Sequence, residues 1–109
     1  YGDLASVVTS DYCTINSCTY QLVGGIAVLS VNITTNSEVP IHGILLDNIP
    51  LRPSVNNNPI QLRKYVGVDE YSAYITRTTA DNINQIKMLS TIPSGTTIRM
   101  EIVFTGAVY

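Results

Sequence analysis

The side chains that could do chemistry gather mainly in one stretch of the second half of this chain. Two adjacent carboxylates are followed by two tyrosines and an arginine, and the single histidine lies further upstream. Aromatic rings stack on sugar faces, while carboxylates and arginine hold hydroxyl groups through paired hydrogen bonds. We therefore predict a saccharide-binding site made of Asp69, Glu70, Tyr71, Tyr74, Arg77 and His42. The alternative is that the tyrosines simply fill half-buried strand faces.

The adjacent carboxylates Asp69 and Glu70 also raise the question of glycoside hydrolysis. That reaction needs two carboxyl groups that converge on one bond, whereas adjacent residues on a strand face opposite sides. A solvated turn is the better interpretation of the pair. No serine lies in a nucleophile motif, and His42 is the only histidine that a triad could use. We predict a protein that is not an enzyme and that needs no cofactor.

The two cysteines, Cys13 and Cys18, are five positions apart. This spacing is too wide for a redox Cys-x-x-Cys pair, and a structural zinc site needs four ligands, to which only His42 could be added. We therefore expect no metal site. Two states stay open for the thiols, a local disulfide across a turn or two buried free cysteines, and we favour the second.

The composition points to a surface with few charges. The chain has 109 residues, which fits a single domain, and charged residues make up 13% of it, about half the usual share. Its net charge of −2 and six scattered basic residues argue against nucleic-acid binding. No apolar run approaches the ~20 residues of a membrane-spanning helix. Such a surface suits a protein that lives in an assembly or meets neutral polar ligands.

The organising element is an extended run at 26–33, opened by Gly24 and Gly25. Its apolar residues follow a period of two, which is typical of a strand with one buried face; Ala27, Leu29, Val31 and Ile33 share that face. The two glycines favour a tight hairpin that pairs 17–23 with 26–33. Irregular alternation around Asn16 and Ser17 predicts a bulge or bend in the preceding strand.

Similar runs continue along the chain and set the fold class. They are predicted over 4–9, 12–23, 41–49, 60–68, 72–79 and 96–106. The segment 83–91 has a period of three that also fits a helix, but Pro93 and Gly95 follow it, so we predict a strand at 84–91 in a hairpin with the last one. We expect an all-β fold, an antiparallel β-sandwich or small Greek-key barrel of about seven to eight short strands without a substantial helix.

The last strand carries one irregularity. Four apolar residues, Ile98, Met100, Ile102 and Phe104, are predicted to face inward there and alternate with polar residues, and Val103 interrupts the polar side. An apolar residue on an outward face indicates a partner surface.

Three segments in a fixed order carry a resemblance to a known family. They are 25–31 (Gly-Ile-Ala-Val-Leu-Ser-Val), 47–53 (Asp-Asn-Ile-Pro-Leu-Arg-Pro) and the closing hairpin from 92–95 (Ile-Pro-Ser-Gly) to Tyr109. In order and spacing they resemble the C-terminal head domains of phage tail-fibre and baseplate receptor-binding proteins. The resemblance covers most of residues 17–109.

This resemblance implies a homotrimeric head, made in the cytoplasm of a bacterial host and mounted at the tail tip or baseplate of a virion. It implies binding of host cell-surface saccharide, attachment to upstream fibre or baseplate proteins, and no membrane insertion. Residues 1–11 would then be the end of an upstream stalk or shoulder, and 1–109 a single head domain. The alternative is a structural or assembly domain of a virion fibre or surface appendage that has no ligand of its own.

Overall fold

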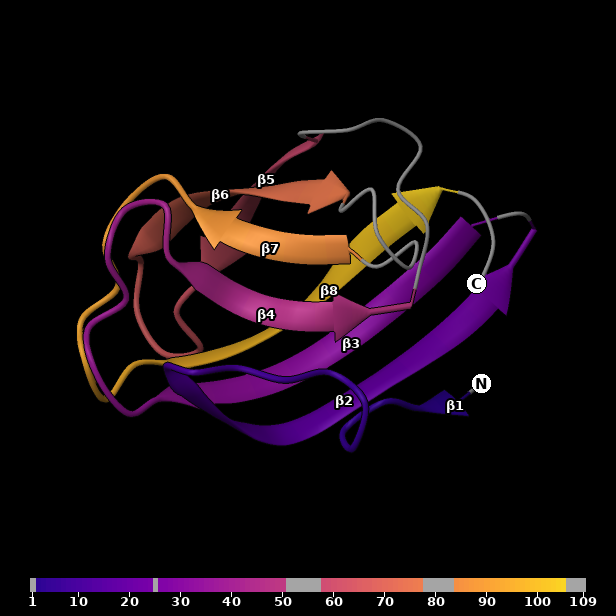
Figure 1. Cartoon of the computed structure of the whole chain (residues 1–109), viewed down its shortest axis with the longest axis horizontal. Coiled ribbons are helices and arrows are strands. Elements are labelled where there is room, and N and C mark those ends of the chain that lie inside the picture. The colour runs from indigo at the N-terminus through magenta and orange to yellow at the C-terminus, as the bar shows by residue number, and fades with distance from the viewer. Residues whose placement is uncertain (1, 25, 51–57, 78–83, 106–109) are drawn as a thin grey trace.

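Two antiparallel sheets pack face to face in this protein (Figure 1). The computed structural model describes residues 2–24, 26–50, 58–77 and 84–105. Within these ranges the strands are β1 (Gly2–Asp3), β2 (Cys13–Val23), β3 (Ile26–Thr35), β4 (Ile44–Ile49), β5 (Asn58–Arg63), β6 (Glu70–Arg77), β7 (Asn84–Met88) and β8 (Thr97–Thr105). One sheet has the order β1-β2-β3-β8 and the other β4-β7-β6-β5. The predicted all-β sandwich is confirmed.

Strand β3 lies inside its sheet, between β2 and β8. Its exposure alternates residue by residue, and the four residues predicted to share a face are all buried: Ala27, Leu29, Val31 and Ile33. The predicted hairpin with β2 is also present, and Gly24 has the positive φ, 56°, that the turn requires. Alternation and turn chemistry therefore agree here, which is why this element was predictable.

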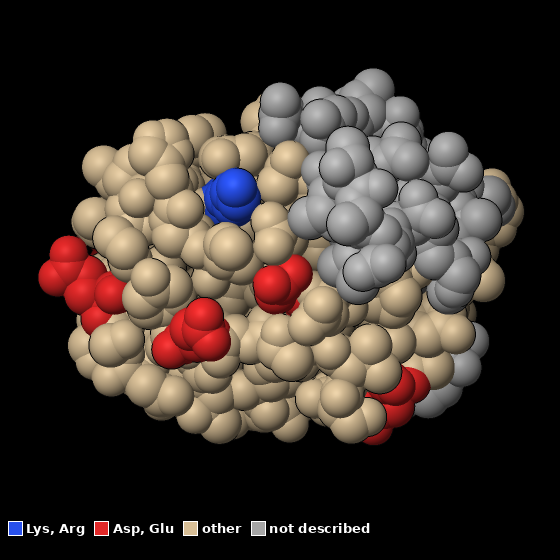
Figure 2. Space-filling model, in the orientation of Figure 1, with Lys and Arg blue, Asp and Glu red and all other residues tan. Residues whose placement is uncertain are grey.

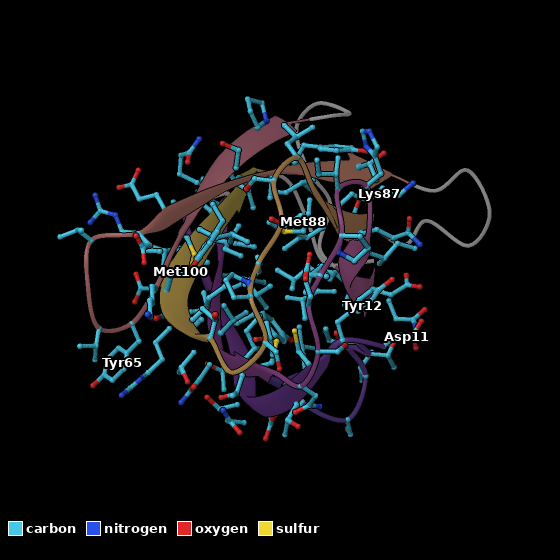
Figure 3. The ribbon with its side chains drawn as sticks, turned by 90° about the vertical axis from the view of Figure 1, so that its left-hand side faces the viewer. Asp11, Tyr12, Tyr65, Lys87, Met88 and Met100 are labelled. Atoms are coloured by element: carbon cyan, nitrogen blue, oxygen red, sulfur yellow. The ribbon has the colours of Figure 1, made fainter. Side chains whose placement is uncertain are left out.

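The core fills the space between the sheets. Its largest fully buried side chains are Leu29, Ile33, Leu45, Leu46, Ile49, Leu62, Ile75, Ile86, Met88 and Ile92. Figure 3 shows Met88 between the two layers. The charged groups lie outside: Figure 2 shows them scattered over a face that is mostly uncharged, as the composition predicts.

A bulge in β2 decides which way its cysteines face. The register with β3 shifts between Ile15 and Ser17, where the sequence predicts a bulge. The extra residue brings Cys13 and Cys18 to the same, inward face, although an odd spacing would separate them in a regular strand. Both thiols are free and buried.

The geometry also explains why these thiols stay apart. Cys13 pairs with Thr35 and Cys18 with Val31, so four residues of β3 separate them, or about 13 Å. A disulfide needs Cα atoms within about 7 Å. Burial raises the pKa of Cys13, and burial together with the negative charge of Asp3 raises the pKa of Cys18 to about 11. Both groups are therefore neutral and poor nucleophiles near pH 7.

Four sequence predictions about the strands need correction, and the first concerns the strand predicted at 60–68, which ends already at Arg63 as β5. The segment at 84–91 does not form a hairpin with the last strand, because β7 lies between β4 and β6 while β8 pairs with β3 in the other sheet. In the predicted strand at 4–9, residues 4–8 form a turn, since the amides of Val7 and Val8 both donate to the Leu4 carbonyl, and only Thr9 is paired, in a β-bridge with Asp47. The strand predicted at 41–49 begins only at Ile44, after a turn.

The first residues of the chain are part of the sandwich. Strand β1 pairs with β2, and the side chains of Leu4 and Val8 are buried in the core. No helix in the described part of the chain is long and apolar enough to span a membrane. In the same residues, no three histidine, cysteine, aspartate or glutamate side chains come together as metal ligands.

Candidate functional site

Two of the predicted site residues, His42 and Tyr74, meet in one surface hollow. It has a volume of about 360 Å³ and is lined by these two side chains together with Pro59 and Leu89. Tyr74 belongs to β6, and its strand partners are Pro59 on β5 and Lys87 on β7. The hollow therefore lies on the outer face of the β4-β7-β6-β5 sheet. An aromatic ring, an imidazole and a proline ring offer the flat surfaces on which a sugar can stack.

A tight turn carries His42 to this place. The Gly43 amide donates to the Pro40 carbonyl at 3.0 Å, and the His42 amide donates to the Met88 carbonyl at 2.7 Å. His42 has φ 65°, as the third residue of a type II turn does. This position normally favours glycine or asparagine, and a side chain that occupies it costs about 1–2 kcal/mol. Such strain concentrates at functional sites.

The carboxylates lie in a second hollow, at the end of the β5–β6 hairpin. Its volume is about 270 Å³, and its lining includes Asp69, Glu70 and Arg63. Arg63 Nε lies 3.3 Å from Glu70 Oε1, but both side chains are exposed, so this ion pair adds little stability. Glu70 and Tyr74 are four residues apart on the same face of β6, about 13 Å. The two hollows are therefore separate.

Of the remaining two predicted residues, one lies in the core, and the side chain of the other falls outside the described structure. Tyr71 points into the core and is only 9% exposed. Its neighbours Ala73 and Ile75 alternate inward in the same way, so that the period of two in the sequence already indicated this side for Tyr71. Arg77 ends β6, and its side chain lies outside the described part of the chain. The predicted set of six thus divides into two surface pairs and a core residue, with Arg77 unassigned.

A third surface feature was missed by sequence reasoning. A groove of about 360 Å³ crosses the outer face of the other sheet, and its lining includes Tyr65, Asn32, Arg99 and Glu101. The outward position of Arg99 and Glu101 follows from the alternation of β8. Tyr65, however, comes from the turn after β5, and no local pattern places that turn beside β8.

No protein family, no curated protein and no solved structure matches this chain.

Proposed function

We propose that this domain is a non-enzymatic receptor-binding head of a phage tail, which attaches the virion to saccharide on the host cell surface. The ordered motifs of the sequence support this proposal through their resemblance to such heads. The observation that carries it is the His42–Tyr74 hollow, which joins stacking surfaces to a strained histidine on the outer face of one sheet. The charge-poor composition also suits neutral polar ligands.

Tyr74 and His42 would make different contacts with the bound sugar. The Tyr74 ring would stack on the sugar, and its hydroxyl would hydrogen-bond at the rim. The His42 imidazole offers one nitrogen donor and one acceptor in its neutral form, which matches a sugar hydroxyl in either role. Pro59 and Leu89 would exclude water from the apolar face of the ring.

We expect Tyr74→Ala to weaken binding to an array of bacterial cell-envelope polysaccharides at least about tenfold, a change of roughly 1.4 kcal/mol. Tyr74→Phe keeps the ring and should bind nearly as the unmodified chain does. His42→Asn removes the imidazole while asparagine still tolerates the positive φ, so it should weaken binding without unfolding the turn.

Val7→Ala serves as the matched control, because Val7 is an exposed residue of the N-terminal turn. Absence of binding to every polysaccharide would contradict the proposed function. Shortening of a bound polysaccharide during incubation would contradict its non-enzymatic character.

A second candidate function is a structural or assembly domain, and an apolar patch favours it. Val23 and Val103 are 52% and 51% exposed on the outer face of the β1-β2-β3-β8 sheet. The register sets Val103 opposite Val28 and Val23 opposite Ile26, so four apolar side chains adjoin at one end of this face. Exposed apolar patches of this kind mark contacts between proteins.

Both candidates share an expected homotrimer, in which this patch would be covered by copies of the chain. Light scattering should therefore give about three times the mass of one chain. Val103→Asp places a charge in the patch and should shift the protein to monomers, while Glu101→Gln, two residues away on the same face, should leave the mass unchanged. A monomer at micromolar concentration in the unmodified protein would argue against the trimer.

A further inference from the structure

The groove on the outer face of β2, β3 and β8 lies on the sheet opposite to the His42–Tyr74 hollow. Its polar lining consists of Ser17, Ser30, Asn32, Tyr65, Arg99 and Glu101. These residues come from three neighbouring strands and one turn. Hydroxyl, amide, guanidinium, carboxylate and aromatic groups are therefore combined on a single surface.

Strand register places these groups in two adjacent rows. Asn32 lies opposite Ser17 on one side and Arg99 on the other. Ser30 lies opposite Glu101 in the next row. Side chains that face each other across strands are about 5 Å apart, so a hydrogen-bond donor and an acceptor adjoin throughout the groove.

One wall of the groove is fixed in place by the backbone. The Tyr65 amide donates to the Thr97 carbonyl at 2.8 Å, and Lys64 forms a β-bridge with Ile98. The turn that carries Tyr65 is thus attached to β8. Figure 3 shows Tyr65 at the margin of the molecule, and 54% of its surface is exposed.

The guanidinium of Arg99 stacks on the Tyr65 ring, which forms this wall of the groove. Its central carbon lies 4.5 Å from the centre of the Tyr65 ring. A stacked guanidinium is held flat, while its N–H groups lie in its own plane and stay available as donors. Asn16 Nδ2 donates to Asn32 Oδ1 at 3.3 Å, which orients the Asn32 amide beside it. The groove is therefore organised before any ligand arrives.

We propose that this groove is a second saccharide subsite, which binds a neutral hexopyranose. Arg99 is positive and Glu101, two residues further along β8, is negative. Their charges offset each other, so the groove does not favour an anion. Sugar hydroxyls both donate and accept hydrogen bonds, and here Arg99 donates while Glu101 accepts. The exposed part of the Tyr65 ring adds a stacking surface. The subsite rests on the proposed saccharide-binding function, but it uses different residues.

The test is NMR mapping of backbone amides during titration with methyl glucopyranoside and methyl galactopyranoside, with glucuronate as the charged probe. We expect a neutral glycoside to shift the amides of Asn32, Arg99 and Glu101. Arg99→Ala and Tyr65→Ala should weaken this binding roughly tenfold, while Tyr65→Phe should keep it. Arg63→Ala is the matched control, since Arg63 is an exposed arginine on the other sheet.

Each outcome separates the subsite from the proposed function. Shifts confined to the surroundings of His42 and Tyr74 would overturn the subsite and support the function. Shifts in the groove that persist in Arg99→Ala, or that arise only with glucuronate, would overturn the neutral subsite. Absence of shifts with all three probes would overturn the subsite, while the polysaccharide array decides the function separately. Thermal unfolding of each variant, expected to match that of the unmodified chain, shows that the exposed substitutions leave the fold intact.

Discussion

Replacing Leu29 with alanine is expected to lower the free energy of unfolding by about 3 kcal/mol. Leu29 is fully buried in the middle of β3, and its strand partners are Tyr20 on β2 and Ile102 on β8. Alanine would remove three buried carbon atoms and leave a cavity that strands on both sides hold open. A domain of this size has a total stability of roughly 5–15 kcal/mol, so the loss is a large part of it.

Urea denaturation followed by circular dichroism measures this change. Val7→Ala is the control, because Val7 is an exposed residue of the N-terminal turn and lies outside the core and the apolar patch. It should cost less than about 1 kcal/mol. Equal losses for the two variants would mean that the core does not lie between the sheets as described.

The second large effect is expected for Thr35→Val, at about 2 kcal/mol. The Thr35 hydroxyl donates to the Pro93 carbonyl and accepts from the Thr96 amide, each at 2.8 Å, and the residue is buried. Valine has nearly the same shape but would leave the buried Thr96 N–H without this acceptor. The Pro93 carbonyl keeps a second donor, the Thr96 hydroxyl, so that the amide carries most of the loss.

Urea denaturation again supplies the measurement, with two comparisons. Thr35→Ser keeps the hydroxyl and should cost only the lost methyl group, about 1 kcal/mol. Thr34→Val removes the neighbouring hydroxyl, which bonds Asn16 and Thr97 on the outer face, where water can replace it. A Thr34→Val variant as unstable as Thr35→Val would show that the buried amide is not the cause.

The sequence predicted which face of a strand is buried more accurately than it predicted which strands pair with each other. Alternation identified the buried side of β3 and the inward positions of Ile98 and Ile102 on β8, because a period of two reflects burial directly. It could not decide that β7 pairs with β4 and β6, since the same pattern suits any strand of either sheet. The wrong hairpin between β7 and β8 follows from proximity in sequence, which the crossing between sheets overrides.

In the candidate site, too, the sequence predicts the direction of a side chain on its own strand but not its contacts with other elements. Tyr71 and Tyr74 are three residues apart on one strand and so face opposite sides, which alternation alone can predict. The meeting of His42 with Tyr74 depends on a turn more than thirty positions earlier in the chain, at the edge of the same sheet. The position of Tyr65 beside Arg99 depends likewise on a contact between elements from different sheets.

The bulge of β2 also governs where the length of this strand can change. It adds one residue between Ile15 and Ser17, and the pairing with β3 is regular on both sides of it. Removal of Asn16 would restore plain alternation and keep Cys13 and Cys18 facing inward. Removal of a residue elsewhere in β2 would exchange the inward and outward side chains at one end of the strand. Homologous chains that differ by one residue in this strand are therefore expected to differ at the bulge.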